Sequence, residues 1–100
     1  MKFTASDQAG QTSISLSGNL TFDDHETFKG VVKLVEESRY GSVVIDLSRV
    51  QMIDSAGIGM LLLANDRARA AAKTLRIGGA AGSVQKVIEV SRLHDLIPAA

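Results

Sequence analysis

The most informative segment of the chain is Val43–Leu63, which reads VVIDLSRVQMIDSAGIGMLLL. Its first residues, Val43–Leu47, form an apolar, largely β-branched run that is typical of a strand covered on both faces. The pattern then predicts a helix over about Gly57–Ala72. Asp54 and Ser55 lie at the turn between the two elements, and Ser55 is flanked by small residues. This geometry favours a serine hydroxyl that a partner can reach, and so a modifiable or reactive side chain.

The composition narrows the class of protein. One hundred residues fit one domain, over residues 1–100, and 45% hydrophobic with 22% charged residues is typical of a folded chain. Eleven basic and eleven acidic residues balance, so no net charge attracts nucleic acid or a membrane surface. There is no cysteine, which excludes disulfides and thiolate metal sites. The start, MKFTASDQAG, lacks a signal-peptide pattern, and no apolar run approaches membrane-spanning length. We therefore expect a soluble cytoplasmic domain without membrane insertion.

Strand and helix patterns alternate along the rest of the chain. A short edge strand, a turn and a half-exposed strand come first, then a helix with Thr21 at its start and Gly41 at its end, and the central unit. A short strand and a last helix capped by Ser83 follow; the expected strands are Lys2–Ser6, Thr12–Gly18, Val43–Leu47 and Leu75–Ile77. Strands joined by long helices imply parallel pairing, whereas the first two strands are joined by a tight turn. The expected fold is a small single-domain α/β structure with a mixed, mostly parallel β-sheet and helices packed on it. Gly30, inside the first helix, is expected to permit close packing against this sheet.

Ser55 has two interpretations from its local chemistry. Phosphorylation would add a charge of about −1.5 to −2 at the start of a helix, where free backbone amides favour an anion. Asp54 would oppose that charge, while Gly57 and Gly59 would let a partner approach the backbone. On this basis, replacing Gly57 with a bulkier residue should hinder docking more than folding. In the other interpretation, Ser55 is only the N-cap of the helix.

The segment DLSRVQMIDSAGIGMLL resembles the motif of the STAS domain family, specifically its anti-sigma factor antagonists. The resemblance implies a regulatory protein of a bacterial partner-switching pathway. Its acceptor serine would be Ser55, phosphorylated by a serine kinase of the GHKL ATPase type that is also the anti-sigma factor. The unphosphorylated protein would bind that kinase, phosphorylation would release it, and a PP2C-type phosphatase would reset the switch. The implied partner-binding residues are Asp23, Asp54, Ala56, Gly57, Ile58 and Gly59.

Two positions depart from the family pattern. Many members carry a hydroxyl residue directly after the acceptor, where this chain has Ala56, and an aspartate after Gly-x-Leu, where it has Thr21. No cofactor or metal is expected, because His25 and His94 lack a ligand partner at metal-binding spacing. The charged run Arg67, Arg69, Lys73 and Arg76 is interpreted as a solvated face or as a patch for an acidic partner.

Two other functions stay open beside the switch. The chain could be a STAS interaction module of a transport or signalling complex that works without phosphotransfer. It could also be a hydrolase with Ser55 as nucleophile, although it lacks GxSxG and has no histidine nearby in the sequence. A tertiary contact of Ser55 with His25 or His94 would be needed for that chemistry. We expect a protein that is not an enzyme.

Overall fold

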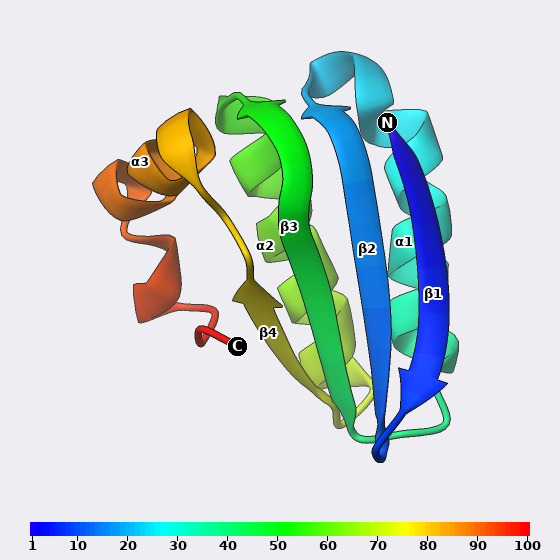
Figure 1. Cartoon of the computed structure of the whole chain (residues 1–100). Coiled ribbons are helices and arrows are strands. Elements are labelled where there is room, and N and C mark those ends of the chain that lie inside the picture. Colours follow the sequence, from blue (N-terminus) through cyan, green and yellow to red (C-terminus); the bar gives the residue numbers. More distant parts are fainter.

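The computed structural model describes all residues 1–100. Four strands and three α-helices alternate, with two short 3-10 turns, η1 and η2 (Figure 1). None of the helices combines the length and the apolar character needed to cross a bilayer. In chain order the elements are β1 (Lys2–Gln8), β2 (Gln11–Leu20), η1 (Phe22–Asp24), α1 (His25–Glu37), β3 (Ser42–Ile53), α2 (Ser55–Ala70), β4 (Thr74–Gly78), α3 (Gly82–Ser91) and η2 (Leu93–Asp95).

The four strands form one mixed sheet in the order β1-β2-β3-β4. β1 and β2 are antiparallel, whereas β2, β3 and β4 run parallel to one another. This confirms the expected fold class, including the antiparallel pair at the start. The sheet order follows the chain order because each parallel connection is a helix that returns to the next position in the sheet.

Helices α1 and α2 cover one face of the sheet, and α3 lies beyond the end of β4 (Figure 1). The covered face carries the alternating apolar residues of the strands, such as Ile14 and Leu16 of β2 and Ile45 and Leu47 of β3, which are fully buried. Gly30 of α1 packs on Phe3 of β1 so closely that a Cβ at this glycine would lie 2.7 Å from the ring. The expectation of close packing at Gly30 is confirmed.

Several element boundaries differ from the sequence prediction, as does the cap of α3. β3 continues to Ile53: Val50 and Ile53 are still buried in the core, while Gln51 and Met52 between them are exposed. Helix α1 ends at Glu37, several residues before Gly41. Helix α3 has Ala81 as its N-cap and no side-chain cap, so the prediction that Ser83 caps this helix is wrong.

The chain after η2 closes the outer edge of β4. Ile77 donates its backbone N–H to the carbonyl of Pro98 at 3.0 Å, and the N–H of Ala100 donates back to Ile77 at 2.8 Å. Ala99 forms a parallel bridge with the same strand residue. The polar groups of β4 that face away from β3 are thereby paired in part, whereas β1 has strand β2 on one side only.

Candidate functional site

The site lies where the parallel strands β2 and β3 end and their following segments meet. The backbone N–H of Asp54, directly after β3, donates to the carbonyl of Leu20 at the end of β2, at 3.3 Å. The N–H of Phe22, in η1, donates to Oδ2 of Asp54, also at 3.3 Å. Two loops that are far apart in the sequence are therefore joined through one carboxylate.

Asp54 is the N-cap of helix α2. It has an extended backbone, and its Oδ1 accepts the N–H of Gly57 at 2.8 Å. Its carbonyl accepts the N–H of Ile58 at 3.1 Å. The interpretation of Ser55 as an N-cap is therefore wrong: Ser55 is the first residue inside the helix, and the residue before it satisfies the amides.

Ser55 is exposed, and its hydroxyl makes no hydrogen bond within the chain. It stands on the wall of a groove of about 540 Å³ between the first turns of α2 and the helix α3. The groove is lined by Ser55, Ile58, Lys86, Val87, Glu89, Val90 and Ser91. Its surface is mainly apolar, and Val90 is 85% exposed. An apolar groove beside a free hydroxyl is a candidate interaction surface.

Gly57 and Gly59 have different environments. Gly57 is buried, and a Cβ there would lie 2.2 Å from the carbonyl oxygen of Leu20 and 2.7 Å from Ile53. A contact this short with backbone cannot be relieved by a side-chain rotation. The expectation that a bulkier residue at Gly57 hinders docking more than folding is therefore corrected: the glycine lets α2 start against the end of β2. Gly59 is exposed with open space around its α carbon.

The remaining predicted partner-binding residues lie on both sides of Ser55. Asp23 is exposed in η1 and takes part in no hydrogen bond or ion pair. Ala56 and Ile58 are half-buried in the first turn of α2, and Ile58 lines the groove. The structure thus gathers the predicted residues at one end of the molecule, with Gly57 inside it.

A second carboxylate, Asp24, holds η1 in place. Its Oδ2 accepts the backbone N–H of Thr21 at 3.0 Å and the Thr21 hydroxyl at 3.1 Å. Its Oδ1 accepts from the amino group of Met1 at 3.0 Å. The Thr21 N–H foremost, and then the Met1 amino group, hold the pKa of the Asp24 carboxyl below its ordinary value. This network positions Phe22, whose N–H reaches Asp54.

The histidines are engaged locally. Nδ1 of His25 donates to the carbonyl of Phe22 at 3.2 Å, and the two rings stack with centroids 5.3 Å apart. Nδ1 of His94 donates to the carbonyl of Ile97 at 2.9 Å. No three His, Asp or Glu side chains form a group with a metal-binding arrangement.

The charged run, which begins in the last turn of α2, is divided among different contacts. Nζ of Lys73 donates to the carbonyls of Val35 and Glu36 at the end of α1. Arg67 lies 3.8 Å from the Glu36 carboxylate. Both cations thus join α2 and the following turn to the negative end of α1, which is a structural role.

The match to a protein-family model covers nearly the whole chain. Residues 3–98 match the family model described as "Mlab, STAS domain". The chain belongs to the STAS domain family. A STAS-domain containing protein of Pseudomonas aeruginosa (strain UCBPP-PA14) is 27% identical over 88 residues, which are 86% of this chain and 84% of that protein.

Solved structures share the STAS fold at low sequence identity. An anti-sigma factor antagonist from Mycobacterium paratuberculosis has a TM-score of 0.85 at 18% identity, covering 98% of this chain and 83% of its own. The Bacillus cell fate determinant SpoIIAA in its phosphorylated form has a TM-score of 0.68 at 19% identity, and the match covers 99% of this chain and 91% of that one. A sulfate transporter family protein from Wolinella succinogenes has a TM-score of 0.72 at 17% identity, and the match covers 88% of this chain and 71% of that one. The STAS fold therefore occurs in anti-sigma factor antagonists and in transporter proteins alike.

Sequence reasoning missed the α3 side of the STAS site. Val84 and Ile88 form the buried face of α3. Val90 lies outside that face, and an isolated valine off the buried face was the available signal. That α3 faces Ser55 follows from tertiary packing alone.

Proposed function

We propose that this STAS domain is an anti-sigma factor antagonist-like switch in a bacterial partner-switching pathway, controlled by phosphorylation of Ser55. The observation that carries the proposal is the position of the Ser55 hydroxyl, which is exposed and unbonded at the start of α2. A kinase can reach it without unfolding the domain. The Oγ–phosphorus bond forms as the bond from the γ-phosphorus to the ADP oxygen breaks, and the hydroxyl proton passes to a base of the kinase.

The partner is a serine kinase of the GHKL ATPase type that also acts as anti-sigma factor. It docks on the end of the molecule that carries Ser55, with the apolar groove beside α3 as part of its contact. A PP2C-type phosphatase removes the phosphate and restores binding. The STAS domain itself acts as a binding module in the cytoplasm and catalyses no step.

Electrostatics account for the direction of the switch. The groove wall next to Ser55 is mainly apolar, and a docked partner would exclude water from it. Placing a charge of about −1.5 to −2 there would require desolvation of a phosphate. The fold tolerates this charge because Ser55 faces solvent, so phosphorylation weakens docking rather than folding.

A second function, an interaction module of a transport or signalling complex without phosphotransfer, is favoured by one observation. The groove with Val90 at its rim already presents an apolar surface while Ser55 is unmodified. A partner can bind such a surface with no modification. The STAS fold of the sulfate transporter family protein is compatible with this role.

The test combines mass spectrometry with binding. The purified protein is incubated with ATP and a candidate GHKL ATPase-type serine kinase, and the modified residue is located by fragmentation. We expect one phosphate, on Ser55, with Ser48 and Ser83 as exposed serines that stay unmodified. Ser55→Ala should bind the kinase constitutively, and Ser55→Asp should release it.

Each outcome decides between the functions. If no phosphate forms while the kinase binds tightly to the unmodified protein, the passive module is correct. If both Ser55 variants bind the kinase like the wild type, Ser55 is no switch. Circular dichroism of both variants must match the wild type, because an unfolded variant would also fail to bind.

A further inference from the structure

The charge environment of Ser55 is set by how the start of α2 is capped. Two amides of the first turn are already engaged, Gly57 N–H by Oδ1 of Asp54 and Ile58 N–H by its carbonyl. Both carboxylate oxygens of Asp54 are also committed, the second one to Phe22 N–H. Part of the N-terminus of α2 is therefore already hydrogen-bonded. A phosphate on Ser55 needs another source of positive charge.

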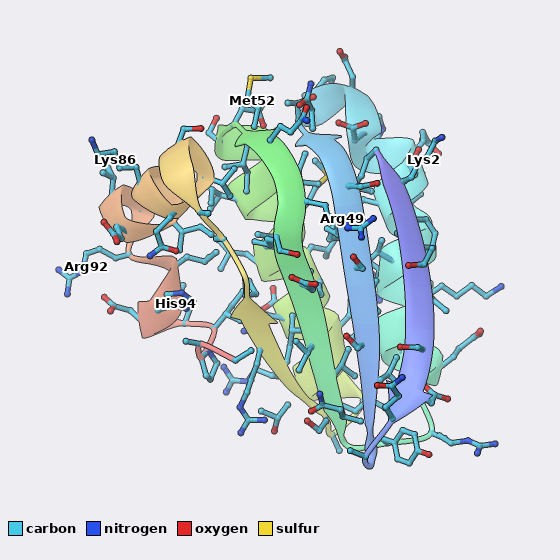
Figure 2. The ribbon with its side chains drawn as sticks, in the orientation of Figure 1. Lys2, Arg49, Met52, Lys86, Arg92 and His94 are labelled. Atoms are coloured by element: carbon cyan, nitrogen blue, oxygen red, sulfur yellow. The ribbon has the colours of Figure 1, made fainter.

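One cationic side chain lines the groove together with Ser55. Lys86 belongs to α3, on the opposite wall, and its ammonium takes part in no hydrogen bond or ion pair. Figure 2 shows Lys86 reaching away from the α3 ribbon into solvent, where its four-carbon stem can rotate. The other charged residue on this wall, Glu89, accepts from the amide of Gln85 at 2.9 Å.

We infer that the ammonium group of Lys86 binds the phosphate on Ser55, and that this ion pair spans the groove between α2 and α3. This inference rests on the proposed phosphorylation of Ser55. Glu89 weakens the pair by repulsion but is held toward Gln85, and Asp54 is turned toward η1. Lys86 is the single lysine or arginine among the groove residues, so no other groove residue competes with it for the phosphate.

The consequence is a second way in which phosphorylation acts on docking. In the unmodified protein the groove is open over Ile58, Val87 and Val90. Once Lys86 turns toward the phosphate, its side chain lies over the apolar floor and the groove is closed. The switch is then steric as well as electrostatic, and it is set inside the domain before any partner arrives.

The experiment uses the full chain with phosphoserine inserted at position 55 during translation, so no kinase is needed. Phosphorus NMR gives the second pKa of this phosphate in the wild type, in Lys86→Gln and in Lys33→Gln. Lys33 is an exposed, unpaired lysine of α1 outside the groove and serves as the matched control. A nearby cation favours the dianion, so Lys86→Gln should raise the phosphate pKa by about half a unit at low salt, and Lys33→Gln should leave it unchanged.

A second measurement follows the groove itself. Backbone amide shifts of Val87 and Val90 should change on phosphorylation in the wild type and in Lys33→Gln, and change less in Lys86→Gln. Equal phosphate pKa values in the two lysine variants overturn the inference and leave the kinase reaction of Ser55 untouched. Failure of the kinase to modify Ser55 would instead overturn the proposed function, with the phosphate–Lys86 pair still measurable.

Discussion

The α carbon of Gly57 lies so close to Leu20 that a β carbon on it would be 2.2 Å from the Leu20 carbonyl oxygen. The contact joins the first turn of α2, which contains Ser55, to the end of β2. A glycine at this position is therefore a requirement of packing between a helix and a strand end.

Gly57→Ala should lower the free energy of unfolding by about 1–3 kcal/mol, since the methyl group forces the helix start away from β2. Gly59→Ala is the matched control two residues on, because it lies in the same helix with open space around it. It should raise stability by up to about 1 kcal/mol through helix propensity. Urea denaturation of both variants measures the contrast, and equal stabilities would show that α2 shifts without cost.

Asp54→Ala should lower stability by about 0.5–2 kcal/mol, because it removes the cap on Gly57 N–H and the bond to Phe22 N–H. Asp54→Asn should cost less, since an amide oxygen also caps well. In thermal unfolding, the melting temperature should fall in the order wild type, Asp54→Asn, Asp54→Ala. A wild-type stability of the alanine variant would mean that water replaces the cap.

The pH dependence of stability should carry a contribution from Asp24. Its pKa is lowered in the folded state, so its stabilisation is complete above the unfolded pKa of about 3.9 and is lost as pH falls through the folded value. Asp24→Asn should cost about 1 kcal/mol at pH 7, with the difference shrinking below about pH 4. Asp23→Asn, next to it but exposed and without contacts, should show no such trend. Denaturation at several pH values tests this, and parallel curves for the two variants would contradict it.

Ala72→Gly should stabilise the turn after α2 by about 1 kcal/mol. Ala72 has a φ of 60°, in the left-handed region, where a β carbon is disfavoured. Ala70→Gly, at the last residue of the helix, should instead destabilise by about 0.5–1 kcal/mol. The melting temperatures should move in opposite directions, and a shift of the same sign in both would disprove the conformational explanation.

Val90→Asp should reduce binding of the kinase at least tenfold, which corresponds to about 1.4 kcal/mol, because it places a charge on the apolar rim beside Ser55. Its side chain is 85% exposed, so folding should be unaffected. Leu96→Asp is the control, an exposed aliphatic residue outside the groove. Calorimetric titration of each variant with the kinase compares them, and equal affinities would remove α3 from the docking surface.

The sequence was sufficient for the sheet and for the place of Ser55, because both depend on local patterns. Alternating and continuous apolar runs identify the strands, and connection lengths decide parallel or antiparallel pairing. The N-cap of α2 was harder to predict, because Asp54 and Ser55 are both good capping residues. The backbone dihedral angles that distinguish the two positions cannot be read from the sequence. The role of Gly57 and the groove beside α3 depend on contacts between segments that are far apart along the chain.

The bond of Pro98 and Ala100 to Ile77 has a consequence for self-association. If both edge strands of the sheet were accessible, copies of the domain could add to one another without limit, as in a fibril. Here residues Pro98–Ala100 occupy part of the β4 edge, at Ile77, whereas β1 has strand β2 on one side only. Edge-to-edge addition of a second molecule is therefore disfavoured at β4 relative to β1, by a segment that lies outside the candidate site.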